Sequence, residues 1–339
     1  MMATLKDVSK ASGFSITTVS RALNGYDDVN KETRDKILNV AKELGYSPNI
    51  LARSLVKKQS KTIGFLVTDL KRESIKDNFM FETLCGVSDE LSDLDYEFVL
   101  LSTTTSKQKN KTYSQMCAER QLDGVVIQGL KRDDPYLLEA IESTVPCVLV
   151  DIPVEGINTG YVTSNQLESA KQAVRYLIRL GHRHIAFMNG APHAYVSTVR
   201  YDAYRQVLHD HEIDFQEEYV LNGDFEEIAS KDAALPFLLN HPEVTAFFCA
   251  SDVMALGVLQ ATRELGLNVP EDLSIIGFDN ILLSQYVSPP LTTVGQQPYE
   301  MGRKAASMIV NIVEGQDVPH EAFVNNQLIL RESVTKNRR

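Results

Sequence analysis

The spacing of apolar residues changes along the chain, and this change divides it into two parts. In the first part apolar residues recur every three or four positions, which is the spacing of helices that bury one face. This spacing predicts three helices, over residues 6–11, 15–24 and 31–44. Gly13 supplies the bend between the first two, and Ser15 can cap the second through its side-chain oxygen. Pro48 then separates a fourth helix, over 49–56, which is too short to be stable alone.

From residue 62 onward, short apolar runs alternate with amphipathic stretches of helical length. The runs are typical of strands buried on both faces, and they lie at residues 62–67, 96–102, 124–129, 146–151, 184–190, 218–225, 245–251 and 273–280. The amphipathic stretches predict helices over 78–94, 107–121, 135–143, 165–180, 198–212, 226–240, 252–265 and 298–314. This repeat indicates a doubly wound parallel sheet, and its restart near residue 161 predicts two similar lobes. Ligands of such sheets bind beyond the carboxyl ends of the strands.

Charge is distributed unequally between the two parts. Residues 1–61 carry 11 Lys and Arg against 6 Asp and Glu, whereas the remainder carries 23 against 39, which gives the whole chain a net charge of -11. A basic first part joined to an acidic body is expected if only the first part contacts nucleic-acid phosphates.

Several functional classes have no support in the sequence. No apolar run is long enough to span a membrane and the chain starts without an apolar leader, so we expect a cytoplasmic protein. The four cysteines are far apart, and the histidines lack the spacing of metal ligands, so we expect no metal site and no cofactor. Glycine-rich phosphate loops and the GxSxG motif are missing from the sequence, which predicts no catalytic residues.

The second predicted helix presents a run of short polar side chains and one arginine. Ile16, Thr17, Thr18, Ser20 and Arg21 point outward if Val19 and Ala22 are buried, and none of the five is anionic. Two helices joined by a tight turn with such a face predict a helix-turn-helix motif that reads the major groove. The alternative is a small helical hairpin with a polar face.

Long motifs occur in both parts of the chain. The first part contains TLKDVSKASGFSITTVSRALNG and VNKETRDKILNVAKELGYSPNILARSL, and the body contains DGVVIQG, IRLGHRHIAFMNG, LSIIGFDN, PPLTTVGQQPYEMGRKAA and LILRESV. In these motifs, which extend over almost the whole chain, the protein resembles the lactose-repressor (LacI/GalR) family of bacterial transcription regulators.

The resemblance implies an α/β chain with three domains. A three-helix helix-turn-helix DNA-binding domain is expected over residues 1–48, a hinge helix and linker over 49–61, and an effector-binding and dimerisation domain over 62–334. This last domain is expected to be a two-lobed, periplasmic-binding-protein-like (type I) body of doubly wound parallel sheets. Its N-subdomain would comprise 62–162 and 292–322, and its C-subdomain 163–291 and 323–334.

In the family the second helix enters the major groove. Ile16 could contact a thymine methyl group, and Arg21 is suited to guanine, with a discrimination of about 1–3 kcal/mol. Leu55 corresponds to the wedge that enters the minor groove and kinks the DNA, although it could also be a buried linker residue. The positions that match the family's DNA contacts are Thr4, Ser15, Ile16, Thr17, Thr18, Ser20, Arg21, Asn24, Asn30, Thr33, Arg34, Asn49, Ala52 and Leu55.

The resemblance also implies an effector in the cleft between the lobes. The family's effector positions correspond to Asp69, Phe79, Gln128, Asp151, Arg200, Phe225, Ser251, Asp252, Asp279 and Gln296. Asp151 and Asp279 end apolar strands, where a carboxylate is costly unless it accepts hydrogen bonds. Arg200 could bind vicinal hydroxyls. Asp252 could instead cap the helix that follows it. His193 and Tyr195 are expected at the rim of the cleft.

The function implied is that of a DNA-binding repressor of a carbohydrate-utilisation operon, released from its operator by a small sugar. A homodimer is expected, with contacts from helices 78–94 and 252–265. In the alternative, a ligand or a partner protein acts as corepressor, as in the catabolite-control and purine regulators of the family. The charged first cleft loop and the Tyr201-Asp202-Ala203 stretch after Arg200 depart from the family pattern, which leaves the identity of the effector open.

Overall fold

The chain folds into two compact units, Met1–Thr62 and Ile63–Arg339. The structure is a computed structural model and describes residues 3–24, 26, 28–46, 59–68, 78–104, 108, 110–131 and 134–338. Each unit has a hydrophobic core of its own. The division falls where the helical spacing of apolar residues gives way to short apolar runs.

The described part of the first unit, called the head below, is built from three helices. These are α1 (Leu5–Ser12), α2 (Ile16–Leu23) and α3 (Lys31–Glu43). Gly13 follows α1 in the left-handed conformation, with a φ of 77°, and so provides the predicted bend. Val8, Val19 and Ile37, one from each helix, are fully buried where the helices meet. The polar residues between these positions therefore face outward.

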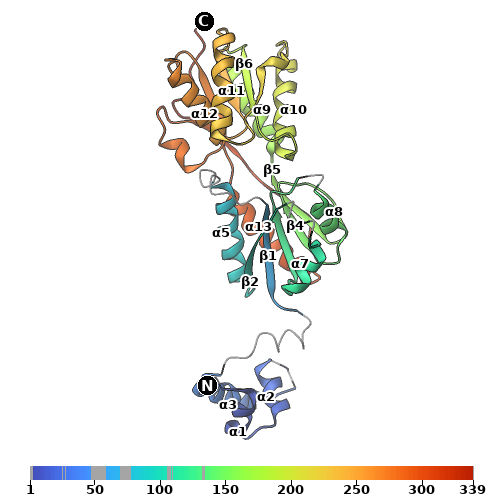
Figure 1. Ribbon diagram of the computed structural model, residues 1–339. Helices are drawn as coiled ribbons and strands as arrows, with labels where there is room; N and C mark the ends of the chain where they lie inside the picture. The colour runs from blue at the N-terminus through green and yellow to red at the C-terminus, as the bar shows by residue number, and fades with distance from the viewer. Residues whose placement is uncertain are drawn as a thin grey trace. The chain divides into compact units, whose positions relative to one another are not determined.

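The second unit, called the body, contains two six-stranded sheets, each the centre of one lobe (Figure 1). The sheet of the first lobe has the order β11-β5-β4-β3-β1-β2. Its strands are β1 (Thr62–Thr68), β2 (Glu97–Thr103), β3 (Gly124–Gln128), β4 (Cys147–Val150), β5 (Thr159–Ser164) and β11 (Glu321–Val324). In Figure 1, α5 (Phe79–Asp93) and α13 (Pro298–Val313) lie on one face of this sheet, and α7 (Tyr113–Glu119) and α8 (Pro135–Glu142) lie on the other.

The sheet of the second lobe has the order β12-β10-β9-β8-β6-β7. Its strands are β6 (Ile185–Asn189), β7 (Val220–Asn222), β8 (Ala246–Cys249), β9 (Ser274–Asp279), β10 (Thr292–Gly295) and β12 (Gln327–Ile329). The antiparallel pair β10–β12 is an exception to the otherwise parallel pairing. Helices α9 (Gln166–Arg179) and α10 (Tyr195–Asp210) pack together, as do α11 (Glu227–Asn240) and α12 (Asp252–Glu264).

The chain passes between the lobes three times, after β5, after β10 and after β11. These crossings lie slightly later in the sequence than the boundaries expected at residues 162, 291 and 322. The reason is that each strand continues to pair until a polar residue ends it, and β10, for example, pairs with β9 through Gly295. Three polar side chains, those of Ser164, Gln296 and Asn326, lie at the crossings.

Two helices begin three or more residues from their predicted starts, and one helix differs from its predicted role. Helix α7 begins at Tyr113 rather than at residue 107, because Thr112 and Gln115 form a capping box. Helix α10 begins three residues earlier than predicted, and no side-chain cap marks its start. Helix α12 is buried inside its own lobe along nearly its whole length, so it offers no apolar face to a second protomer. No described helix is long and apolar enough to cross a membrane.

Candidate functional site

Helix α2 presents an exposed face to solvent. Ile16, Thr17 and Arg21 are exposed on it, whereas Val19 and Ala22 are buried against the other helices. An exposed isoleucine has no structural role in the core of a small helical unit, but it is suited to contact a thymine methyl group. The arrangement of apolar and polar faces predicted for this helix is therefore present.

Several of the predicted DNA-contact residues cap the helices of the head. Thr4 accepts a hydrogen bond from the Asp7 backbone and forms a capping box at α1. Ser15 Oγ accepts from the Thr18 backbone at 3.1 Å, and Asn30 Oδ1 accepts from the Thr33 backbone at 2.8 Å. These side chains fix the helix starts, and backbone N–H groups at helix starts are suited to bind phosphate.

The two arginines of the predicted DNA-contact set have different surroundings. Arg21 Nη1 lies 2.5 Å from Asp28 Oδ2, and its guanidinium carbon is 5.9 Å from the centre of the Tyr26 ring. Both members of this ion pair are about half exposed. Arg34 Nη2 donates to the carbonyl oxygen of Tyr26 at 2.6 Å, so it supports the loop between α2 and α3 instead of facing outward.

Of the remaining predicted DNA-contact residues, Asn24 forms a local contact, and others lie outside the described residues. Asn24 Nδ2 donates to the Ser20 carbonyl oxygen at 2.8 Å near the end of α2. The predicted hinge helix and four predicted contact residues lie outside the described residues; the four are Asn49, Ala52, Leu55 and, in the cleft, Asp69.

A cavity of about 340 Å³ lies between the two lobes of the body. Seven of the ten residues predicted for the effector site line it, from both lobes; they are Phe79, Gln128, Asp151, Arg200, Phe225, Asp279 and Gln296. His193 and Tyr195, expected at the rim, also line it, together with Leu130, Lys131 and Ile152. The volume is in the range of sites for small organic ligands. The cavity is where the carboxyl ends of the strands of both sheets meet, as expected for this architecture.

Three residues that line the cavity have a backbone conformation that side-chain-bearing residues rarely adopt. The φ angles are 56° for Asp151, 60° for Phe225 and 110° for Asp279. Each of these residues lies at or just beyond the end of a strand. Such conformations cost about 1–3 kcal/mol each and persist where the surrounding structure enforces them, which is common at binding sites.

Arg200 is buried, with 2% of its surface exposed, and its guanidinium has contacts on several sides. Nε and Nη2 donate to Gln166 Oε1 at 3.1 and 2.8 Å, and Nη1 donates to the Ala250 carbonyl oxygen. Nη2 also lies 3.8 Å from Asp279 Oδ1. The guanidinium stacks on Phe278, at 3.7 Å from the ring centre. The cation is thus held in one orientation toward the cavity.

Two acceptor groups face the cavity from the first lobe. Asp151 Oδ1 accepts from Thr163 Oγ1 at 2.7 Å. Burial raises the pKa of Asp151, and the hydrogen bond from Thr163 and the nearby Arg200 charge oppose this shift. Gln128 Oε1 is buried and has no hydrogen-bond partner among the described residues. An unpaired buried acceptor at a cavity wall is suited to accept from a ligand hydroxyl or N–H group.

Ser251 and Asp252, also predicted for the effector site, do not line the cavity. Ser251 caps α12 by accepting from the Met254 backbone at 3.2 Å, which is the role considered for Asp252. Asp252 is fully buried and accepts from the Ile281 backbone at 2.9 Å and from Thr293 Oγ1 at 2.6 Å. Burial raises the pKa of Asp252 to about 7. Ser251 thus fixes the start of α12, and Asp252 holds the backbone at Ile281, just after β9.

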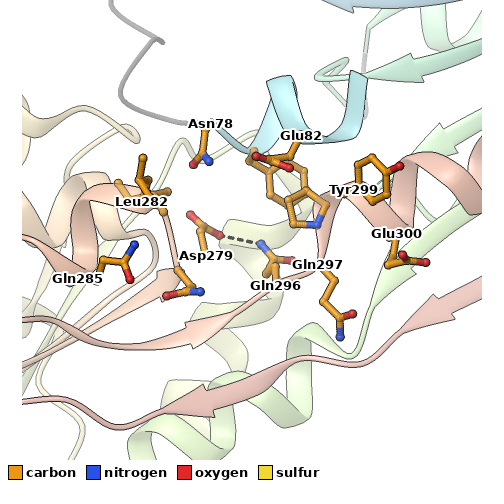
Figure 2. Close-up of a pocket in the computed structure, with 13 residues that line it drawn as sticks. Asn78, Glu82, Asp279, Leu282, Gln285, Gln296, Gln297, Tyr299 and Glu300 are labelled. Carbon is orange, nitrogen blue, oxygen red and sulfur yellow. Dashed lines mark hydrogen bonds between the residues drawn. The ribbon is translucent and has the colours of Figure 1, made fainter. Parts of the chain in front are cut away.

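A second hollow, of about 420 Å³, shares Phe79, Asp279 and Gln296 with the first (Figure 2). Gln296 Nε2 donates to Asp279 Oδ1 at 2.7 Å in the wall between the two. The other polar side chains that line the second hollow are amides, two carboxylates and one phenol: Asn78, Glu82, Asn280, Gln285, Gln297, Tyr299 and Glu300. Among the described residues that line it, none is a lysine, an arginine or a histidine.

Sequence reasoning missed the residues behind the cavity. Gln166, Ser164 and Asn326 contact its lining residues or one another through hydrogen bonds but belong to no motif. The one signal available was their position directly after apolar strands. Within the described residues no group of three His, Cys, Asp or Glu side chains could hold a metal ion.

A two-lobed body with a cavity between parallel sheets, attached to a helix-turn-helix head, defines the architecture of a regulatory DNA-binding protein. Comparisons with known proteins agree with this class. The family described as bacterial regulatory proteins, lacI family, matches residues 4–49, and that of the periplasmic binding protein-like domain matches 174–334. The chain belongs to the lacI family and is a transcriptional repressor of that family, as the sequence motifs predicted.

The curated relatives and solved structures reported below cover nearly the whole chain. The HTH-type transcriptional repressor PurR of Haemophilus influenzae (strain PittEE) is 32% identical over 98% of this chain and 99% of its own. The transcriptional regulator CelR in complex with cellobiose is 30% identical, with a TM-score of 0.74 over 98% of this chain and 99% of its own. The lac repressor dimer bound to operator and the anti-inducer ONPF is 25% identical, with a TM-score of 0.83 over 99% of this chain and 100% of its own.

Proposed function

We propose that this repressor binds a pseudo-palindromic operator as a homodimer through its two heads, and that a small sugar bound between the lobes releases it. The operator would control carbohydrate-utilisation genes. The observation that carries the proposal is the cavity in which Asp151, Arg200 and Asp279 converge beside Phe79 and Phe225.

This set of side chains is suited to a polyhydroxylated ligand. Carboxylates accept hydrogen bonds from sugar hydroxyls, the guanidinium of Arg200 donates to their oxygens, and Gln128 Oε1 accepts one more. An aromatic ring such as Phe225 packs on the apolar face of a sugar ring. The bound cellobiose of the similar CelR structure supports a sugar of one or two rings.

The proposed mechanism joins the cavity to the head through the first lobe. Ligand contacts from both lobes favour one arrangement of the lobes over another, and the predicted hinge helix over residues 49–56 would respond to the spacing of the two first lobes in the dimer. A helix this short is near its folding midpoint, so a small change can unfold it. Operator and effector must then weaken each other's binding by the same factor.

A thermal-shift screen of the full chain tests the ligand class, since a ligand in excess raises stability by mass action. The screen would contain mono- and disaccharides, their phosphates, and purine bases. The operator is first identified by selection from randomised DNA. A stabilising sugar is then added to the protein–operator complex in an electrophoretic mobility-shift assay. We expect the sugar to release the DNA. Operator affinity that is indifferent to the stabilising sugar would contradict the allosteric part of the proposal.

A second candidate is a planar ligand that acts as corepressor. Three aromatic residues, Phe79, Tyr195 and Phe225, line the cavity, which is the surrounding that a flat base prefers. The similarity to repressors named PurR adds weight to this candidate. A purine that stabilises the chain and strengthens the shifted band would favour it over the sugar.

A further inference from the structure

A ring of four side chains lies behind the cavity and joins its cation to its carboxylate. Arg200 donates to Gln166 Oε1 through Nε at 3.1 Å and Nη2 at 2.8 Å. Gln166 Nε2 donates to Gln296 Oε1 at 2.8 Å, and Gln296 Nε2 donates to Asp279 Oδ1 at 2.7 Å. Figure 2, a close-up of the second hollow, shows this last bond in the wall that the hollow shares with the cavity. Asp279 Oδ1 closes the ring, at 3.8 Å from Arg200 Nη2.

Arg200 and Asp279 fix the direction of the hydrogen bonds that run between them through the two glutamines. A guanidinium only donates and an ionised carboxylate only accepts, so each glutamine must turn its oxygen toward the arginine side and its nitrogen toward the aspartate side. Each glutamine therefore needs both a donor and an acceptor. A glutamate at position 166 would keep the acceptor for Arg200 and lose the donor for Gln296.

Gln166 also connects the ring to the places where the chain passes between the lobes. It is the first residue of α9, directly after the first crossing, and its Nε2 donates to Ser164 Oγ at 2.8 Å. Gln296 follows β10 at the second crossing. Asn326, at the third, donates to Ser164 Oγ at 3.0 Å. Gln166 Nε2 also lies 3.4 Å from Asp151 Oδ1 of the first lobe.

Gln166 does not line the cavity and has 3% of its surface exposed. We propose that Gln166 is a positioning residue that holds Arg200 for the ligand and transmits its displacement to the three crossings. A ligand that pulls on Arg200 or Asp279 changes a bond of the ring, and the ring is attached to the crossing strands through Gln166 and Ser164. The part of this inference that concerns a ligand rests on the proposed function above.

Three variants of the full chain separate this role from simple packing. Gln166→Met keeps the length of the side chain and removes both hydrogen-bonding groups. Gln166→Glu retains the bonds from Arg200 and removes the bonds that Nε2 donates to Gln296 and Ser164. Gln316→Met is the matched control, because Gln316 is an exposed glutamine with a hydrogen bond to Glu314.

Hydrogen–deuterium exchange without ligand is the deciding measurement. In Gln166→Met we expect roughly three- to tenfold faster exchange at residues 164–166, 295–297 and 325–327, and also in α10 around Arg200, from the loss of hydrogen bonds. In Gln166→Glu we expect faster exchange at the crossings only. Unchanged exchange at the crossings in Gln166→Met, or the same pattern in both variants, would overturn the proposal. If the methionine variant does not fold, the pattern in Gln166→Glu decides.

A thermal-shift titration with a fixed set of mono- and disaccharides adds a functional measurement. For a sugar that stabilises the wild type, we expect Gln166→Met to lose about tenfold or more in affinity, and Gln166→Glu to lose less. Equal affinity in wild type and Gln166→Met would contradict a positioning role. A set in which no sugar stabilises the wild type counts against the sugar effector, whereas the exchange pattern still decides the role of Gln166.

Discussion

The face of the head that is predicted to read DNA and the cavity of the body are both polar, but their side chains are organised differently. In the head, hydrogen bonds join residues close in sequence, such as Thr4 with Asp7 and Arg21 with Asp28, and the side chains are exposed. At and behind the cavity, buried side chains join residues up to 130 positions apart, such as Gln166 and Gln296. The head presents residues that act one at a time, whereas the cavity residues act as a network.

The backbone shows the same contrast. Within residues 3–46, the described positions with positive φ are the glycines Gly13 and Gly45. At the cavity, Asp151, Phe225 and Asp279 adopt positive φ while carrying a side chain. The body therefore holds strained residues in place through its network, so we expect larger effects from substitutions in the cavity than from substitutions on the face of the head.

The largest effect is expected from Arg200→Met. The substitution leaves the oxygen of Gln166 without its donors and the carboxylate of Asp279 without its nearby cation in a buried site, which costs about 3–5 kcal/mol of unfolding free energy. It also removes the cation from the cavity. Urea unfolding and ligand titration should show both losses, and we expect ligand affinity to fall by about two orders of magnitude or more.

The control for this prediction is Arg175→Met. Arg175 forms an ion pair with Glu168 on the surface of α9, and both side chains are substantially exposed. Removal of such a pair changes stability by about 1 kcal/mol or less. Equal losses in the two variants would show that Arg200 contributes no more than a surface arginine, and the contrast between network and independent residues would fail.

The sequence predicted the head more closely than the cavity, because contacts in the head are local in sequence whereas those at the cavity join distant residues. Caps such as Ser15 and Asn30 act on residues three positions away, so local spacing indicates them. The strand-end residues Asp151 and Asp279 were also indicated, because parallel strands end at a common edge. Gln166 is indicated only by its position after an apolar strand, since its partners Asp151, Arg200 and Gln296 come from distant parts of the chain and only the fold brings them together.

The second prediction concerns Asp252, whose buried carboxyl group has its pKa raised to about 7. The folded state then holds a proton that the unfolded chain releases near the ordinary value of 3.8. Stability from this group is complete below about pH 4 and is lost as the pH rises toward 7. In Asp252→Asn, which does not titrate, the decline in unfolding free energy from pH 4 to 7 should be smaller by roughly 2–4 kcal/mol.

Asparagine can retain the two contacts of this site, because its oxygen can accept from the Ile281 backbone and the Thr293 hydroxyl can accept from its nitrogen. The measurement is urea unfolding at a series of pH values for both proteins. Parallel curves would show that Asp252 is ionised in the folded protein throughout this range. The head contains no buried carboxyl group among its described residues, so the difference should arise from the body alone.

The third prediction concerns the head. Arg21→Ala should weaken binding to the operator selected by the wild type by about 1–3 kcal/mol and should relax the preference for guanine at one position of each half-site. Binding to unrelated duplex DNA should change less, because phosphate contacts are shared by other residues. Fluorescence anisotropy on both DNAs measures this. An equal loss on both would assign Arg21 to the phosphate backbone instead of a base.

The smallest effect is expected from Thr4→Ala. The substitution removes the cap of α1, which costs about 0.5–2 kcal/mol. Two hydrogen bonds from Thr4 also lower the pKa of Asp7, so the capping box contributes stability above the ordinary pKa of that carboxyl and loses it as the pH falls through the lowered value. Amide exchange in α1 should therefore become faster at neutral pH in Thr4→Ala and should depend less on pH at the acid end.

Thr17→Ala, which changes an exposed hydroxyl on α2, is the control and should leave exchange in α1 unchanged. If Thr4→Ala also altered exchange in α2 and α3 by the same amount, the head would respond as one cooperative unit, and its residues would resemble the cavity network more than the contrast drawn above allows.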